Sequence, residues 1–282
     1  MQPQNADQSA ELDLAKAVKV YRATRSLAFA NIPAIDMKDR LSVLTVASGL
    51  RRVGVLETWG QRLPQTRERM IANGLATSVA TCVWSSIERP VETPHRVVLR
   101  ALDERRVAGK PKHVLWLYAT AAERERYRQP SHTQQQAGGL LGYPPCCIAF
   151  ESSVMGLLPK AQLESLIAEV GEDDAALTRA LRVTGELPAP KIPLPDNALR
   201  TEQRYPFALH VACDACLEDG GSATAAINAR YSELAMQVDA GFHALFLAVQ
   251  ETYCQVAGDQ EQNRDLLLGI RTMHAKFFSN GP

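Results

Sequence analysis

The spacing of hydrophobic residues divides the chain into a helical beginning, a middle rich in strands and a helical end. In the first part, apolar side chains recur at helical spacing in the ranges 11–30, 36–54 and 62–74. Pro33 and the glycines that end the second and third ranges are typical helix terminators. The pattern therefore predicts an N-terminal helical segment over residues 1–75.

The middle of the chain has short β-branched and aromatic runs that are typical of strands. Residues 78–86, 95–102 and 113–120 each form such a run, bounded by proline, glycine or charged residues. The last run is apolar enough to be a buried strand. The sequence therefore predicts a small sheet between residues 78 and 120.

After residue 120 the helical pattern returns. The ranges 144–156 and 160–171 are predicted helices, and in 222–238 four apolar residues share one helical face: Ile227, Tyr231, Leu234 and Val238. Residues 186–197 hold four prolines and predict an extended loop. We interpret it as a loop within one region, 76–282, that continues the same domain. Together the patterns predict an α+β fold: a mostly helical single domain with a small β-sheet in the middle of the chain.

Charge and composition narrow the classes of function. The 282 residues carry 31 Lys plus Arg and 31 Asp plus Glu, so bulk charge predicts no binding to nucleic acid or to an anionic membrane. No apolar run has the length of a membrane span, and the polar, acidic N-terminus does not resemble a signal peptide. We therefore expect a cytoplasmic protein, in which cysteines indicate metal binding or catalysis before disulfides.

Two of the six cysteines, Cys146 and Cys147, are adjacent and follow Pro144 and Pro145. Proline is favoured at the first helical position, so the prolines predict a helix that begins here, with both cysteines in its first turn. The exposed N–H groups and the positive end of the helix favour thiolates. We therefore expect both cysteines to ionise more readily than free cysteine.

A second group lies further along, where His210, Cys213 and Cys216 follow one another at three-residue spacing. The Cys-x-x-Cys spacing lets two thiolates converge on one metal ion or cluster, and it is also the spacing of dithiol redox sites. Cys82 and Cys254 stand alone within a strand pattern and a helix pattern, which is typical of buried apolar cysteines.

The adjacent pair favours an iron–sulfur cluster over a single ion. Neighbouring side chains on a helix point about 100° apart, so adjacent cysteines do not easily hold one small tetrahedral ion, whereas a wider cluster accepts divergent thiolates. We therefore predict an iron–sulfur site of the 4Fe-4S kind, with Cys146, Cys147, Cys213 and Cys216 as ligands. Two alternatives stay open: zinc, in which His210 can replace one cysteine, and a metal-free site in which Cys213 and Cys216 form a dithiol.

Two other side chains are candidates for moving protons. His210 is a candidate ligand or proton donor, or else a histidine that caps a strand end. Tyr143, about one turn before the cysteine pair, either donates a hydrogen bond to a sulfide or substrate or packs beneath the turn. Gly138, Gly139 and Gly142 favour a helix end and a turn over a close backbone approach to a phosphate.

The two cysteine motifs resemble those of a little-characterised prokaryotic family of unknown function. Its Leu-Gly-Tyr-Pro-x-Cys-Cys signature is matched at residues 141–147, and its later His-x-x-Cys-x-x-Cys element at 210–216. The family often has Pro and Ser around the first cysteine of that element, where this chain has Ala212 and Asp214, so the local turn can differ. The resemblance covers about residues 134–235 and implies one site built from the four cysteines and the histidine, with no particular reaction.

The predicted function is that of a cytosolic metalloprotein with redox or Lewis-acid activity on a small molecule, in which His210 or Tyr143 handles protons. The expected partners are a small-molecule substrate or a redox partner protein. The alternatives are a non-catalytic protein with a structural zinc site and a metal-free thiol oxidoreductase. The sequence therefore leaves open whether the protein is an enzyme, as an oxidoreductase or a lyase.

Overall fold

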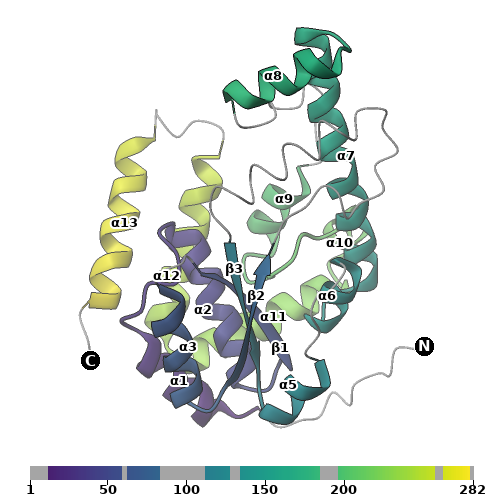
Figure 1. Cartoon of the computed structure of the whole chain (residues 1–282). Coiled ribbons are helices and arrows are strands. Elements are labelled where there is room, and N and C mark those ends of the chain that lie inside the picture. The colour runs from purple at the N-terminus through teal and green to yellow at the C-terminus, as the bar shows by residue number, and fades with distance from the viewer. Residues whose placement is uncertain are drawn as a thin grey trace.

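The computed structural model describes residues 12–58, 62–82, 112–127, 134–184, 196–257 and 263–279, which form a helical body around a small sheet (Figure 1). The elements run in this order: α1 (Leu14–Thr24), α2 (Pro33–Ala47), β1 (Val53–Thr58), α3 (Leu63–Ala72), β2 (Ala76–Cys82), β3 (Lys112–Tyr118), α5 (Ala121–Tyr127), α6 (Gln134–Leu140), α7 (Pro145–Val170), α8 (Asp174–Thr184), α9 (Asn197–Arg204), α10 (Asp214–Glu218), α11 (Ala223–Val238), α12 (Ala240–Gln255) and α13 (Arg264–Ser279). The predicted fold class, mostly helical α+β with a small sheet, is confirmed.

The sheet is antiparallel, with β3 between β1 and β2. Leu115 and Leu117 of β3 lie fully buried in the main core on one face. On the other face, Tyr118 packs with Val53 of β1 and with Leu141, which follows α6. Burial on both faces explains why β3 is apolar without clear alternation.

Two of the three expected strands are confirmed with shifted bounds. The run at 78–86 forms β2, and the run at 113–120 forms β3. The run at 95–102 lies outside the described residues.

The predicted helical segment over residues 1–75 contains α1, α2 and α3, but strand β1, which was not predicted, lies between α2 and α3. Helix α2 ends at Ala47, and Gly49 then adopts the left-handed conformation, with φ of 77°, which turns the chain away from the helix. Gly54 of β1 lies so close to α2 that a Cβ there would meet Val46 Cγ2 at 2.7 Å. Pairing with β3 and packing on α2 therefore decide the conformation of a short segment whose periodicity is ambiguous.

Helix α2 lies at the centre of the main core and is buried on nearly every side. β1, α1, α11, α12 and α13 all contact it. The helical face predicted for α11 is confirmed, because Tyr231 and Leu234 are buried there while Ile227 and Val238 pack partly buried against the same core.

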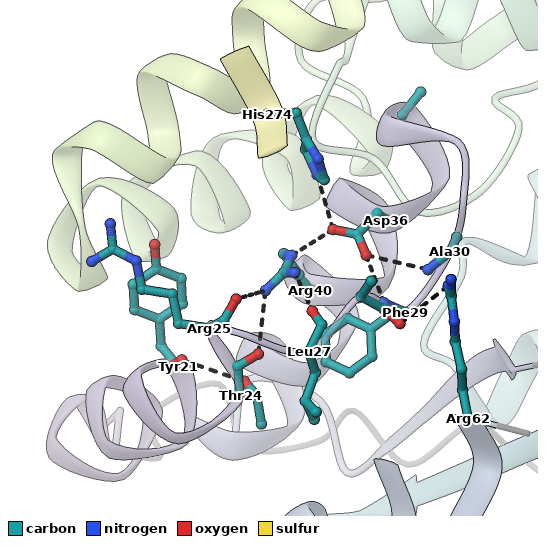
Figure 2. A network of polar contacts seen from close by, with 12 residues as sticks. Tyr21, Thr24, Arg25, Leu27, Phe29, Ala30, Asp36, Arg40, Arg62 and His274 are labelled. Carbon is teal, nitrogen blue, oxygen red and sulfur yellow. Dashed lines mark hydrogen bonds and ion pairs between the residues drawn. The ribbon is translucent and has the colours of Figure 1, made fainter. Parts of the chain in front are cut away.

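A buried polar network ties α2 to α13 and to the segment between α1 and α2 (Figure 2). The Asp36 carboxylate is fully buried and accepts hydrogen bonds from the following donors: the N–H groups of Phe29 (2.7 Å) and Ala30 (3.2 Å), Arg40 Nε (2.6 Å) and His274 Nε2 (3.0 Å). Burial raises the pKa of Asp36, but the hydrogen bond from His274 and the charge of Arg40 outweigh it and hold the pKa below its usual value. The carboxylate is thus ionised and fully partnered.

Arg40 satisfies its remaining donors on the chain that enters α2. Its guanidinium donates to the backbone carbonyls of Thr24, Arg25 and Leu27. The guanidinium carbon also lies 3.6 Å from the ring centre of Phe278 in α13. Asp36 and Arg40 together therefore hold three separate parts of the helical body.

Helix α7 is one continuous helix of 26 residues, so the prediction of two helices over 144–156 and 160–171 is wrong in its division. Gly156, which ends the first range, and Pro159, which lies between the two ranges, are typical helix terminators, and the helix continues through both. In the view of Figure 1, α7 lies on the opposite side of the body from α13 and carries α8 near its far end. Within the described ranges, no helix combines the length and the apolar character needed to cross a membrane.

Candidate metal centre

Two helix starts deliver the four cysteines to one place. Helix α7 begins at Pro145, with Pro144 before it, which confirms the predicted helix start and places Cys146 and Cys147 in the first turn. In the preceding turn, Gly142 has a φ of 73°, a conformation that glycine adopts without steric cost. The turn that ends α6 therefore leads directly into the cysteine pair.

Helix α9 fixes the backbone that leads to the second pair. Cys213 immediately precedes α10, and Cys216 lies within it. Asn197 Nδ2 donates to the carbonyl of Ala212 at 3.0 Å, while Thr201 Oγ1 accepts from the Ala212 N–H at 2.9 Å. Both polar groups of the residue before Cys213 are thus held by side chains of α9.

The same region is anchored to the main core. Tyr205 donates its hydroxyl proton to the carbonyl of Cys216 at 3.1 Å. From the central helix α2, Lys38 Nζ donates to the carbonyls of Pro206 and Ala208, each at 2.6 Å. The position of the second cysteine pair is therefore set by contacts to α2 and α9 as well as by its own turn.

The four sulfur atoms form one compact group that can hold a metal ion, because all lie within 4.8 Å of one another. Cys147 Sγ lies 3.9 Å from Cys146 Sγ, 3.9 Å from Cys213 Sγ and 3.6 Å from Cys216 Sγ. Cys146 Sγ lies 3.6 Å from Cys216 Sγ. The sulfurs of the adjacent pair therefore lie closer together than their expected divergence on the helix suggests. Both sulfurs lie close to those of Cys213 and Cys216 at the start of α10, although neighbouring side chains leave a helix in different directions.

Three of the four cysteines are shielded from solvent. Cys147, Cys213 and Cys216 are 1%, 7% and 5% exposed, and Cys146 is exposed. The buried three pack in a small apolar cluster that includes Tyr205. Solvent therefore reaches the group mainly from the side of Cys146.

The expectation that both cysteines of α7 ionise readily is wrong for the free thiols. Burial raises the pKa of Cys146, and it raises the pKa of Cys147 to about 12. Cys216 behaves differently: burial raises its pKa, but hydrogen bonds from Thr224 and the neighbouring thiols outweigh burial and leave the pKa lowered. A cation at the centre favours thiolates throughout the group, so metal binding is expected to release protons.

Thr224 lies between His210 and the sulfurs and contacts both. His210 Nε2 is 3.0 Å from Thr224 Oγ1, and that oxygen is 3.5 Å from Cys147 Sγ. The compact group consists of the four cysteines, which argues against the zinc alternative in which His210 replaces one of them. Burial, together with the positive charges of Lys38 and Arg51, lowers the pKa of His210 to about 4, so the imidazole is neutral at neutral pH.

Tyr143 connects this histidine to the sheet. Its ring centre lies 5.0 Å from that of His210, and the ring packs against the cluster of Val53, Tyr118 and Leu141. Burial raises the pKa of Tyr143, so its phenol stays protonated at neutral pH. The two residues predicted to move protons thus lie together beside the sulfurs, and their catalytic role stays a prediction.

The glycine pair in α6 allows close packing against α7. A Cβ at Gly138 would meet Ile148 Cγ1 at 2.9 Å, whereas a Cβ at Gly139 would meet nothing within 4 Å. We expect Gly138→Ala to lower the free energy of unfolding by about 1–3 kcal/mol through overpacking. Gly139→Ala should raise it by about 0.5–1 kcal/mol through helix propensity. Urea unfolding of the two variants measures the difference, and equal stabilities would contradict this packing.

Sequence reasoning missed two residues near the centre. Thr224 could have been found from its place in the first turn of the helix that follows Cys216, but Arg51 carries no sequence signal of burial. Cys254 lies outside the compact group, in agreement with the interpretation of an isolated cysteine. The side chain of Cys82 lies outside the described residues.

Comparison with known proteins adds no further assignment. No family model, curated protein or solved structure matches this chain. The resemblance of the two cysteine motifs to a prokaryotic family therefore stays a prediction, and the functional argument depends on the geometry of the site.

Proposed function

We propose that the four cysteines hold a single metal ion, zinc, in a structural site that joins the start of α7 to α10. The spacing of the sulfurs supports this proposal most directly. A tetrahedral zinc with Zn–S distances of about 2.3 Å places any two of its sulfurs about 3.8 Å apart. Four of the six sulfur–sulfur distances, at 3.6, 3.6, 3.9 and 3.9 Å, fit that edge length, and all six are within 4.8 Å.

A 4Fe-4S cluster, the centre predicted from the sequence, requires a wider arrangement. Each iron takes one thiolate, and the other irons and sulfides lie between the ligands. The sulfurs of Cys147, Cys213 and Cys216 would have to move apart, and α7 would have to separate from α10. The compact group therefore favours a single ion over a cluster.

The closure of the site favours a structural role over catalysis. Structural zinc sites have four protein ligands, whereas catalytic sites keep one position open for water or substrate. Four thiolates complete a tetrahedron, and the N–H of Cys213 and the hydroxyl of Thr224, each 3.5 Å from Cys147 Sγ, support negative charge on that sulfur. The redox or Lewis-acid activity, the substrate or redox partner and the cytoplasmic location stay predictions from the sequence.

Metal analysis after anaerobic purification tests the proposal. We expect a colourless protein with one zinc per chain, and replacement of zinc by cobalt(II) should produce the absorption of a tetrahedral thiolate site. A brown protein that contains iron and acid-labile sulfide, and that dithionite bleaches, would establish the cluster instead. A single iron without sulfide would retain the geometry but change the metal. A metal-free protein with a titratable disulfide would favour the thiol oxidoreductase.

A further inference from the structure

Arg51, which lies between α2 and β1, carries a buried guanidinium with two unpartnered nitrogens. The residue is 5% exposed, and its Nε and Nη2 atoms are fully buried with no hydrogen-bond partner. Across the described ranges, no carboxylate forms an ion pair with it. Its positive charge is therefore left without a counter-charge by the described part of the protein.

A buried guanidinium in this state is energetically unfavourable. Arginine stays protonated in proteins, and a buried charge needs both a counter-charge and hydrogen bonds. Arg40 meets this requirement through Asp36 and backbone carbonyls. Arg51 contacts Tyr143 through a side-chain hydrogen bond and through the ring, whose centre lies 5.6 Å from the guanidinium carbon, and these contacts to a neutral side chain offset only part of the cost. The missing component is an anion.

The two unpartnered nitrogens indicate which anion fits. Nε and Nη2 form the edge of a guanidinium that donates two parallel hydrogen bonds to one carboxylate or phosphate group. This planar fork, which a lysine ammonium lacks, matches two adjacent oxygens of one group. The site therefore favours a planar or tetrahedral oxyanion. The anionic group must be small, because it has to reach the Nε and Nη2 edge of Arg51, which the protein shields from solvent.

Other polar groups gather in the same place. His210 Nδ1 is also buried without a hydrogen-bond partner, and its ring packs on the ring of Tyr143 that Arg51 contacts. Burial raises the pKa values of Tyr143 and Tyr231 and lowers that of His210, and the positive charge of Arg51 acts on all three in the downward direction. These side chains therefore share one electrostatic environment with the guanidinium.

We propose that Arg51 anchors a binding site for the carboxylate or phosphate group of a small molecule, with Tyr143 as a neighbouring contact. The contact of His210 with Thr224, and of Thr224 with Cys147, connects this site to the metal centre. The ligand thus binds beside the metal centre and takes no coordination position on it. The proposal does not depend on which metal the cysteines hold.

Anion titration of the full chain tests the site, with inorganic phosphate and acetate as separate probes in chloride buffer at constant ionic strength. The variant is Arg51→Gln, and the matched control is Arg52→Gln, because Arg52 is the adjacent arginine and is exposed. We expect calorimetry to show saturable binding of phosphate or acetate to the wild type and to the control. Binding to Arg51→Gln should be about tenfold weaker or more, since charged hydrogen bonds are lost.

Stability separates a binding role from a structural one. In chloride buffer alone, Arg51→Gln should be at least as stable as the wild type, because it removes an uncompensated charge. A second variant, Arg51→Lys, keeps the charge but loses the fork, so it should fold and bind weakly. The proposal is overturned if neither probe saturates the wild type, or if Arg51→Gln or Arg51→Lys binds with unchanged affinity. It is also overturned if Arg51→Gln is equally destabilised with and without anions. The probe that binds more tightly identifies the chemical group.

Discussion

Replacement of Cys147 by serine should abolish tight metal binding and destabilise the region around α7 and α10. Cys147 is 1% exposed, and its sulfur contacts the other three sulfurs of the group. A structural zinc site with four ligands binds zinc with a free energy of roughly 10–16 kcal/mol. Loss of one of the four ligands, taken as one quarter of that free energy, weakens zinc binding by about a hundredfold or more. Competition with a chromophoric chelator measures the affinity, and urea unfolding measures the stability that is lost with the metal.

Cys254→Ser is the matched control for that variant. Cys254 is a partly buried cysteine outside the sulfur group, so serine there should leave metal affinity unchanged. Unchanged affinity in Cys147→Ser would show that Cys147 is not a ligand. Loss of metal in both variants would show that the measurement reports general unfolding, and the assignment of the ligands would then fail.

Replacement of Asp36 by asparagine should lower the free energy of unfolding by about 3–5 kcal/mol, which is the typical cost of removing one partner from a buried ion pair. Asparagine keeps the shape of the side chain but leaves Arg40 charged and buried without its partner. The carboxylate oxygens of Asp36 accept hydrogen bonds from the N–H of Phe29 and from His274. The NH2 group of asparagine donates and cannot accept, so one of these hydrogen bonds is lost. Urea unfolding at neutral pH measures the loss.

A surface ion pair supplies the control for this prediction. Arg124 and Glu125 lie 2.7 Å apart, but their side chains are 36% and 62% exposed, so Glu125→Gln should cost about 0–1 kcal/mol. Equal losses for Asp36→Asn and Glu125→Gln would refute the role of burial.

The dependence on pH follows from the direction of the shift at Asp36. Its pKa in the folded protein lies below the ordinary value of 3.8, so the unfolded chain binds the proton more tightly. The carboxylate therefore contributes its stability above pH 3.8 and loses it as the pH falls through the folded pKa. The gap in stability between the wild type and Asp36→Asn should accordingly narrow in acid.

Local chemistry made part of this site predictable. The start of α7 follows from Pro144 and Pro145, whose fixed backbone angles suit a helix start and whose missing N–H groups cost nothing there. The Cys213 and Cys216 pair follows from its spacing alone. These features depend on residues close together in the sequence, and the structure places all four cysteines in one group.

Other features depend on distant parts of the chain and could not be predicted. The sulfurs of Cys213 and Cys216 meet those of the α7 pair because α9 holds the chain before α10 in position, through side chains such as Asn197 and Thr201. β1 forms because β3 supplies its partner, and the isolation of Arg51 depends on which groups surround it in space. Helical spacing gives directions along one element but carries no information about such contacts.

With the proposed metal bound, the sulfur group would act as a cross-link between distant positions of the chain. Cys147 and Cys213 are 66 positions apart, so a bound metal closes a long loop through α7, α8 and α9. By analogy with a disulfide that closes a loop of this size, the closure removes chain entropy from the unfolded state worth about 4 kcal/mol. The distance along the chain also sets an order of events during synthesis, because the two ligands at the start of α7 are made long before the two ligands at α10. Until Cys216 emerges, the first pair has no partners, and the metal can lock the loop only as one of the later steps of folding.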